Sequence, residues 1–296
     1  MLSNWLVKTM IRFQVRRAYA GGFNLDGWRA FMRSLGMLAR IPRNISVKTV
    51  DLDGIEAMHF RPQDPMENCA AVYLHGGLYV GGSSYDYREL IARLARSINC
   101  HIYAVDYRLA PEHLFPAAVE DARGAFAYVN SKYFRTAVLG DSAGAGLAMA
   151  VMRPNPDSPA PVAGALLSPM IDLTLSGRSI DERAGRDLVF RREALESTVQ
   201  MYLGDRSAKD PDASPLFADL SGFPPMQIHI GTEEMFFDDA RRLFERANKA
   251  GVEVELHEWN GMIHDFQLAA LLLKDGRDSI RLIGNFLRPH MQEKNK

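Results

Sequence analysis

The sequence lacks the cysteines of a disulfide-stabilised or zinc-binding protein. It holds only Cys69 and Cys100 among 296 residues, and they form no CxxC pair. Two isolated cysteines favour inert, buried thiols in a reducing compartment. The pattern HExxH is absent as well, and His257 and His264 are spaced too widely to replace it. Because these ligand patterns are missing, we expect no metal site.

An excess of one charge sign and long apolar runs are also missing. The net charge is −1, so we expect neither a nucleic-acid partner nor a charged, disordered tail. No uncharged apolar run approaches the ~20 residues that cross a membrane. The first residues, MLSNWLVKTMIR, begin like an export signal, but Lys8 and Arg12 interrupt its apolar segment. We therefore predict a cytoplasmic protein without stable membrane insertion.

What the sequence does contain is an alternation of short apolar strands and helices. Apolar strands separated by helices are typical of a mostly parallel sheet that is covered on both faces. We therefore predict an α/β fold, with residues 1–296 as a single domain. The expected strands are 46–51, 55–60, 70–75, 101–106, 136–140, 163–168, 226–231 and 252–259. The expected helices are 86–98, 116–132, 143–152, 236–250 and 273–288.

Two segments fall outside this alternation. Residues 1–40 carry apolar side chains at three- and four-residue steps, which predicts helices with one apolar face. Residues 175–224 are charged at their start, helical in the middle and loop-like near their end. We expect the apolar faces of residues 1–40 to pack on another part of the protein, and residues 175–224 to lie over the carboxyl ends of the strands, where open α/β sheets bind ligands. The residues expected to line an apolar pocket there are Trp5, Phe13, Trp28, Phe31, Met32, Met201, Tyr202 and Phe217.

The segment LGDSAGAG ends an expected strand and opens an expected helix. A phosphate-binding loop is one interpretation, but the segment has neither GK[ST] nor the last glycine of GxGxxG. The other is a nucleophile mount of the GxSxG type, in which Gly140 and Gly144 leave room for Ser142 at a tight strand-to-helix turn. We favour the second, because the N–H groups that open the helix would stabilise negative charge developing beside the serine.

A glycine pair follows the expected strand 70–75. Gly76 and Gly77 expose backbone N–H groups with no side chain beside them, so these groups are able to face a reacting carbonyl oxygen. Together with the N–H group of Ala143 they would form an oxyanion hole with three donors. The alternative interpretation is a flexible glycine loop without a chemical role.

A histidine and an acid follow the last two expected strands. His264, in GMIHDF, is placed to reach over the sheet as a general base for the serine. Glu234, in GTEEMFFD, is the expected acid that orients the imidazole ring. Glu233 and Asp238 are the competing candidates for that position.

Together these motifs resemble the bacterial hormone-sensitive-lipase-like family of α/β-hydrolases. The resemblance spans about residues 68–270, in the order serine, acid, histidine. Its segments are LHGGLYVGGS, DYRLAPEHLFPAAVED, GDSAGAG, SPMIDLT and GMIHDF. It implies an α/β-hydrolase fold with a helical cap formed by about residues 1–40 and about residues 175–224. It also implies a serine carboxylesterase that forms an acyl-serine intermediate on short- to medium-chain esters. It implies no metal and no organic cofactor.

Two positions depart from the family's pattern. Leu78 stands where the family has a third glycine, and we expect it to narrow or reshape the pocket. Glu234 stands where the family has an aspartate. One additional methylene group still allows a carboxylate to hold the histidine, so we keep it as the expected acid.

The triad does not identify the substrate, because pocket shape decides it. A small-molecule ester is expected, with an amidase, an aryl-formamidase, a peptidase or a lactone hydrolase as alternatives that use the same residues. A non-catalytic ligand-binding relative is a further alternative, since fold does not fix function. The last expected strand, 252–259, alternates apolar and polar residues. As an edge strand it would invite pairing, which makes a homodimer through it a separate hypothesis.

Overall fold

The computed structural model describes residues 22–37, 39–155 and 159–292, together with Thr9, Arg12 and Val15. Within these ranges, eight strands form one sheet in the order β1-β2-β4-β3-β5-β6-β7-β8. β1 and β2 run antiparallel to their neighbours at one edge, and all pairs from β4 to β8 are parallel. The strands are β1 (Ile45–Asp51), β2 (Glu56–Pro62), β3 (Cys69–Leu74), β4 (His101–Val105), β5 (Arg135–Asp141), β6 (Gly164–Leu167), β7 (Met226–Gly231) and β8 (Val254–Trp259). The predicted α/β fold with a mostly parallel sheet is confirmed.

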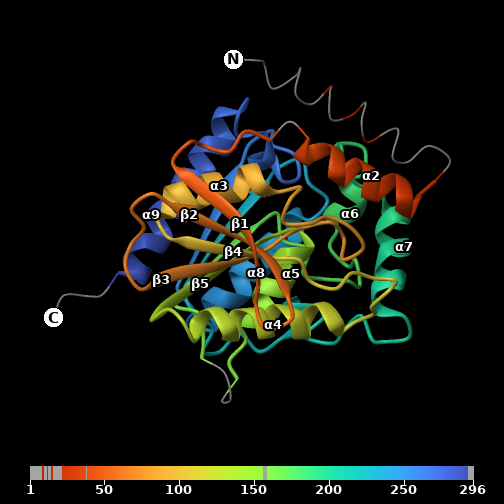
Figure 1. Cartoon of the computed structure of the whole chain (residues 1–296). Helices are drawn as coiled ribbons and strands as arrows, with labels where there is room; N and C mark the ends of the chain where they lie inside the picture. The colour runs from red at the N-terminus through yellow and green to blue at the C-terminus, as the bar shows by residue number, and fades with distance from the viewer. Residues whose placement is uncertain are drawn as a thin grey trace.

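Helices cover both faces of this sheet (Figure 1). On one face α3 (Arg88–Ile98) packs against α9 (Lys274–Met291), and on the other lie α4 (Ala117–Asn130), α5 (Ala143–Met152) and α8 (Phe237–Lys249). Every residue of β3 and β7 is consequently buried. β3 is apolar along most of its length, whereas Gln227 and His229 on one face of β7 are buried polar residues that bond to each other at 2.9 Å. Among the described residues, no helix combines the length and the apolar character needed to span a bilayer.

The sheet gathers the candidate site at one of its edges. The segment after β3 carries Gly76 and Gly77, and the turn after β5 carries Ser142. The loops after β7 and β8 carry Glu234 and His264. Because parallel strands all end at the same edge, residues that are far apart in sequence become neighbours there. We refer to these four segments as the catalytic edge.

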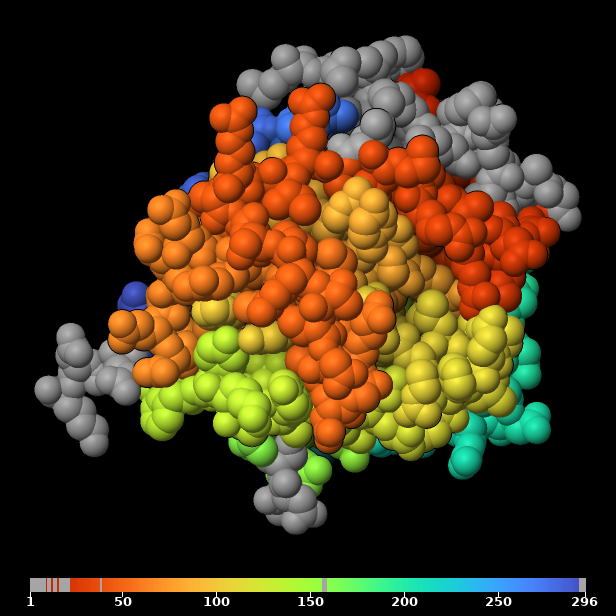
Figure 2. Space-filling model, viewed as in Figure 1, coloured from red at the N-terminus to blue at the C-terminus, as the bar shows by residue number. Residues whose placement is uncertain are grey.

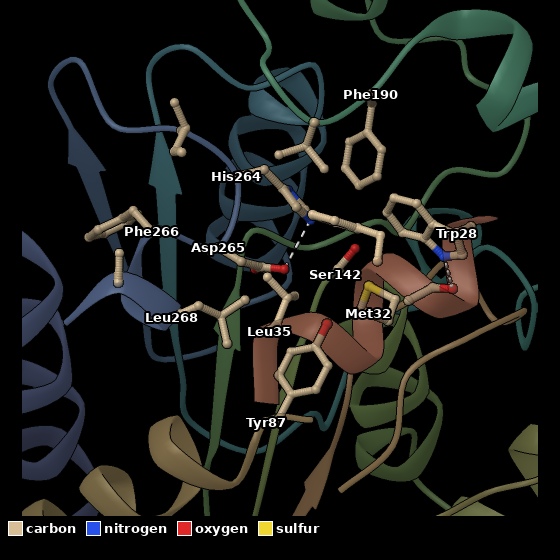
Figure 3. Close-up of a pocket in the computed structure, with 15 residues that line it drawn as sticks. Trp28, Met32, Leu35, Tyr87, Ser142, Phe190, His264, Asp265, Phe266 and Leu268 are labelled. Atoms are coloured by element: carbon tan, nitrogen blue, oxygen red, sulfur yellow. Dashed lines mark hydrogen bonds and ion pairs between the residues drawn. The ribbon is translucent and has the colours of Figure 1, made fainter. Parts of the chain in front are cut away.

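Helix α2 (Leu25–Gly36) covers the catalytic edge. Asn24 begins the helix, because its side-chain oxygen accepts the N–H group of Gly27 at 2.8 Å. The apolar face of the helix buries Trp28 and Met32. Both side chains point toward the candidate site in Figure 3, so the predicted amphipathic helix buries its apolar face there.

Polar contacts on another face of α2 connect it to the body of the protein. The guanidinium group of Arg29 donates to the carboxylate of Glu112 at 2.6 Å. In Figure 2, α2 (red) borders the yellow residues that precede α4, where this ion pair lies. Most of the remaining cap predicted over 1–40 lies outside the described residues, including the expected pocket residues Trp5 and Phe13.

The second predicted cap segment, residues 175–224, leaves the sheet after β6 and returns at β7. It contains α6 (Ser179–Glu182), α7 (Arg192–Leu203) and the short 3₁₀ helix η1 (Pro215–Phe217). We refer to α2 and this segment as the cap. The strand expected at an edge of the sheet, β8, does lie there, since it pairs with β7 alone.

Candidate active site

Ser142 occupies the sharp turn between β5 and α5. Its backbone has a φ of 52° and a ψ of −120°, which residues other than glycine rarely adopt. The N–H group of Ser142 donates to the carbonyl of Leu167 on β6 at 2.9 Å, and its own carbonyl accepts from Ala145 at 3.1 Å. These bonds hold the turn, and the serine side chain lines an apolar cavity.

The two glycines of GxSxG are required by close approaches of the backbone. A Cβ atom at Gly140 would lie 2.2 Å from the carbonyl oxygen of Gly144. A Cβ atom at Gly144 would lie 2.0 Å from the carbonyl oxygen of Leu74. Side chains are therefore excluded at both positions, in agreement with a nucleophile mount.

The backbone of Gly76 and Gly77 lies beside the serine. A Cβ atom at Gly76 would lie 3.0 Å from the Cβ atom of Ser142, and Gly77 lines the same cavity. Ala143 is the first residue of α5, where N–H groups have no partner within the helix. The three residues expected to donate to an oxyanion therefore surround one serine. Their role as donors stays a prediction.

Leu78 is not among the residues that line the cavity, although its neighbour Gly77 is. The side chain is fully buried, and its expected effect on the pocket stays a prediction. Its backbone has a φ of 61°, in the left-handed region that favours glycine. A third glycine would suit this position for its backbone freedom, and leucine costs strain of about 1–3 kcal/mol.

Glu234 pairs with His264. Its Oε2 atom lies 2.9 Å from Nδ1 of the imidazole ring. Its Oε1 atom accepts the N–H group of Gly231 at 2.6 Å and the hydroxyl group of Ser168 at 2.9 Å. The fully buried carboxylate thus has three partners, which fix it relative to the ring. Burial raises the pKa of Glu234, although the bond to His264 opposes this.

The two competing acids have other surroundings. An oxygen of Asp238 accepts the N–H group of Ser179 at 3.0 Å, and Glu233 is only partly buried. Among the described residues, the carboxylates that pair with His264 are Glu234 and one that the sequence analysis did not assign.

That additional carboxylate is Asp265. Its Oδ2 atom lies 3.0 Å from Nε2 of His264, as the dashed line in Figure 3 shows. A general base would use this nitrogen to accept the proton of Ser142. The Oγ atom of Ser142 is buried and has no hydrogen-bond partner among the described residues. Asp265 stands directly after the histidine in GMIHDF, but sequence gives no indication of where its side chain points.

The charges around His264 determine its protonation. Burial alone would lower the pKa of His264, because an imidazolium loses its hydration inside a protein. The charge and hydrogen bond of Asp265, followed by those of Glu234, outweigh this and hold the pKa well above its usual range. A raised pKa favours the imidazolium form of the ring, in which both nitrogens donate.

Asp141 adds a further buried carboxyl group directly before Ser142. Burial raises its pKa well above the usual range, and the charge of Asp265 raises it further. Its Oδ1 atom accepts the hydroxyl group of Tyr73 at 2.5 Å. A raised pKa favours the uncharged form of this carboxyl group, which carries no negative charge toward the imidazole.

An apolar cavity of about 80 Å³ opens onto Ser142 and His264. Its walls come from α2, from the segment between α6 and α7, and from the loop after β8 (Figure 3). The lining residues are Trp28, Phe31, Met32, Leu35, Gly77, Tyr87, Ser142, Val189, Phe190, Ile263, His264, Asp265, Phe266, Leu268 and Ala269. Among the described residues, no group of three or more His, Cys, Asp or Glu side chains is placed to hold a metal ion.

Among the described residues that the sequence predicts to line the cavity, only those on α2 do so. The expected residues found there are Trp28, Phe31 and Met32. The prediction is wrong for Met201, Tyr202 and Phe217. Tyr202 stacks on Tyr79 in the core, with ring centroids 3.9 Å apart, and Phe217 is 40% exposed. A helical segment has several faces, and its apolar residues did not indicate which face meets the site.

Asp187, for which the sequence shows no motif, joins the cap to the catalytic edge. Its Oδ1 atom accepts the N–H groups of Val189 at 2.8 Å and Phe190 at 3.0 Å. Its Oδ2 atom accepts the N–H group of Met235 in the loop after β7 at 2.9 Å. Phe190 packs edge-on against His264, with ring centroids 4.5 Å apart. One buried carboxylate thus positions a cavity wall against the imidazole.

Comparison with known proteins gives a family and close relatives. A family model described as alpha/beta hydrolase fold matches residues 71–268. An acetyl-hydrolase of Streptomyces hygroscopicus is 39% identical over 222 residues, which cover 73% of this chain and 74% of that protein. An esterase of Acinetobacter venetianus is 31% identical over 261 residues, which cover 85% of this chain and 86% of that protein.

Solved structures extend the similarity to nearly the whole chain. The crystal structure of an esterase from the bacterial hormone-sensitive lipase family has a TM-score of 0.92 and 34% identity, covering 98% of this chain and 100% of the other. A hormone-sensitive lipase from a metagenome library has a TM-score of 0.93 and 32% identity, covering 98% of this chain and 99% of the other. The agreement therefore includes the cap as well as the sheet.

Proposed function

Because the chain belongs to the bacterial hormone-sensitive-lipase-like family of α/β-hydrolases, we propose that it is a serine carboxylesterase for short- to medium-chain acyl esters. The observation that carries this proposal is the convergence of Ser142, His264 and Glu234 at one apolar cavity. The relatives named acetyl-hydrolase and esterase support the same class of reaction.

The first half of the reaction forms the acyl-enzyme. Neutral His264 accepts the proton of Ser142 through Nε2 while Oγ attacks the ester carbonyl carbon. The N–H groups of Gly76, Gly77 and Ala143 stabilise the oxyanion, and one such donor is worth about 3 kcal/mol. The imidazolium then gives its proton to the leaving alcohol.

The second half releases the acid. Water enters the site, and His264 accepts its proton as the oxygen attacks the acyl-serine carbonyl. Collapse of the second tetrahedral intermediate returns the proton to Ser142 and frees the carboxylic acid. Glu234 stays ionised throughout, because it keeps the proton of the imidazole on Nδ1 and stabilises the imidazolium.

The size of the cavity favours the short end of the substrate range. A volume of about 80 Å³ is small for a ligand pocket. The walls are almost entirely apolar, with Trp28, Phe31 and Phe190 among them. An acetyl to hexanoyl group suits such a space, whereas a long fatty acyl chain would require the cap to move.

Two proposals concern the surroundings of the enzyme. A cytoplasmic location is supported by Cys69 and Cys100, which are buried and belong to no disulfide among the described residues, as suits a reducing compartment. A homodimer through β8 is supported by the place of that strand at the sheet edge. Light scattering at micromolar concentration tests the second proposal, and a monomer would count against it.

The function is tested with p-nitrophenyl esters from acetate to palmitate and with the matching p-nitroanilides. We expect ester turnover with kcat/KM highest at short acyl chains. Ser142→Ala and His264→Ala should lose several orders of magnitude in kcat, with far-UV circular dichroism unchanged. Preferred anilide turnover would instead favour an amidase, and turnover that survives Ser142→Ala would refute the assignment.

A further inference from the structure

The imidazole of His264 has a carboxylate on each nitrogen, whereas the hydroxyl group of the serine that it should activate has no hydrogen-bond partner within the described part of the chain. Glu234 lies 2.9 Å from Nδ1 and Asp265 lies 3.0 Å from Nε2. Figure 3 shows Ser142 and Asp265 reaching the same region beside the ring from different segments. Nε2 therefore has two candidate partners, and in this structure it is paired with Asp265.

The backbone holds Asp265 firmly in this position. Its N–H group donates to the hydroxyl oxygen of Ser168 at 3.1 Å, and that hydroxyl donates to Glu234 at 2.9 Å. The backbone of Asp265 has a φ of 50°, which aspartate and asparagine tolerate better than most residues. Ser168 thus links the carboxylate of Glu234 to the backbone of Asp265 beside one ring.

The protonation state of the ring decides which partner Nε2 prefers. An imidazolium donates from both nitrogens, so it bonds well to two carboxylates. A neutral ring that keeps its proton on Nδ1 for Glu234 has a lone pair on Nε2. That lone pair is repelled by the carboxylate of Asp265, and it accepts readily from the hydroxyl group of Ser142.

We propose that Asp265 is a positioning residue that binds Nε2 of protonated His264 and gives way to Ser142 once that nitrogen loses its proton to solvent. Asp265 thereby sets the pH at which the general base becomes available. It also stabilises the imidazolium that forms when the ring accepts the serine proton, before that proton passes to the leaving alcohol. This inference rests on the proposed esterase function.

Other acidic groups face the ring, and each is held differently. Glu234 occupies Nδ1, and Asp187 of the cap accepts three backbone N–H groups. Asp141 at the end of β5 bonds to Tyr73, and burial raises its pKa. Asp265 is the carboxylate that reaches Nε2, so its removal should affect this nitrogen more than the loss of any other charge.

The test compares the pH dependence of kcat/KM in the wild type, Asp265→Asn and Asp265→Gly. Asparagine keeps the shape and the left-handed backbone but removes the charge, and glycine removes the side chain without backbone strain. Losing the negative charge of Asp265 at this distance should lower the pKa of His264 by about 1–3 units. The acidic limb of the kcat/KM profile should move to lower pH by the same amount. The plateau at high pH should fall, because the imidazolium loses a stabilising partner. The variant and wild-type profiles should therefore cross.

Glu233→Gln is the matched control. It removes one negative charge beside Glu234 but changes no residue that contacts His264. The acidic limb of its kcat/KM profile should therefore lie at the same pH as in the wild type. Variants of Asp265 that lower kcat/KM equally at all pH values, without moving the limb, would show a merely structural role and overturn the proposal.

A second measurement separates this inference from the esterase function. The imidazole of His264 is titrated directly by 15N–1H NMR in Ser142→Ala and in Ser142→Ala/Asp265→Asn. A lower titration pKa in the double variant supports the role of Asp265 whether or not esters are the substrates. An unchanged pKa overturns that role while the esterase function stands on its own assay.

Discussion

The catalytic edge and the cap are held together by different kinds of contact. At the catalytic edge, backbone segments approach so closely that even one Cβ atom is excluded at Gly140, Gly144 and Gly231. The cap has fewer such approaches: side chains such as Arg29 on α2 and Asp187 between α6 and α7 attach it, beside backbone bonds such as that from the N–H group of Phe115 to the carbonyl of Tyr202. Backbone segments in such close contact have little freedom to move. A contact made by a side chain, in contrast, can be removed by substituting that residue.

The two regions accordingly have different tasks: the catalytic edge carries the reacting groups, and the cap shapes the cavity that selects the substrate. The groups that need accurate placement, the serine and the imidazole with its acids, stand on the rigid sheet edge. Trp28 and Phe190 belong to the cap and shape the space for the acyl group. The two regions meet where the indole N–H group of Trp28 donates to the carbonyl of Gly77 at 3.2 Å. Substitutions should therefore act on kcat at the catalytic edge, and on stability and KM in the cap.

The largest effect is expected from Glu234→Gln at the catalytic edge. The amide cannot hold His264 in the tautomer with its proton on Nδ1, so kcat should fall by about 10³–10⁴-fold. The urea midpoint should change little by comparison, because the shape of the side chain is kept. Steady-state kinetics beside the control Glu233→Gln measures this. Equal losses in both variants would show that the structure has identified the wrong acid.

An intermediate effect is expected from Asp187→Asn in the cap. The substitution turns one accepting oxygen into an NH2 group. This donor would face the N–H group of Met235, which loses its acceptor, and the loss should cost about 1–3 kcal/mol of unfolding free energy. Because Phe190 is displaced from the cavity wall, KM should rise more than kcat falls. Urea unfolding and ester kinetics measure both.

Asp181→Asn is the control for this prediction. Asp181 is an exposed residue of α6 whose ion pair with Arg192 stays within the cap. It should leave KM unchanged. If Asp187→Asn lowered kcat and left KM unchanged, the assignment of KM to the cap and of kcat to the catalytic edge would be contradicted.

The smallest effect is expected from Glu112→Gln, at the ion pair between α2 and the body. The hydrogen bond from Arg29 lowers the pKa of Glu112 to about 2. A depressed pKa stabilises the folded state above the unfolded value of about 4.3, and this contribution is lost as pH falls toward 2. The pair is largely exposed, so the variant should lose only about 0.2–1 kcal/mol at pH 7.

Urea unfolding at pH 7 and pH 3 measures this difference, which should shrink at the lower pH. Glu196→Gln is the control, because its ion pair with Arg192 lies within α7 and does not connect the cap to the body. An effect at Glu112 of several kcal/mol would mean that the cap is attached as rigidly as the catalytic edge.

Sequence was most informative where one residue type alone fits. Gly140 and Gly144 could be assigned because a strand-to-helix turn with an outward serine excludes every side chain. The strands could be assigned because burial on both faces demands continuous apolar residues. The left-handed backbone of Leu78, by contrast, leaves no trace in the pattern of apolar residues.

The sequence by itself determined the sheet, the helices on both faces, and the serine, acid and histidine brought to one edge. Local patterns suffice for these, because periodicity and glycine positions follow directly from backbone geometry. Only the tertiary structure decided that Asp265 pairs with Nε2, that Asp187 ties the cap to the loop after β7, and that Phe190 rather than Tyr202 meets the cavity. Those outcomes depend on side-chain directions and on contacts between distant segments, which no local pattern encodes.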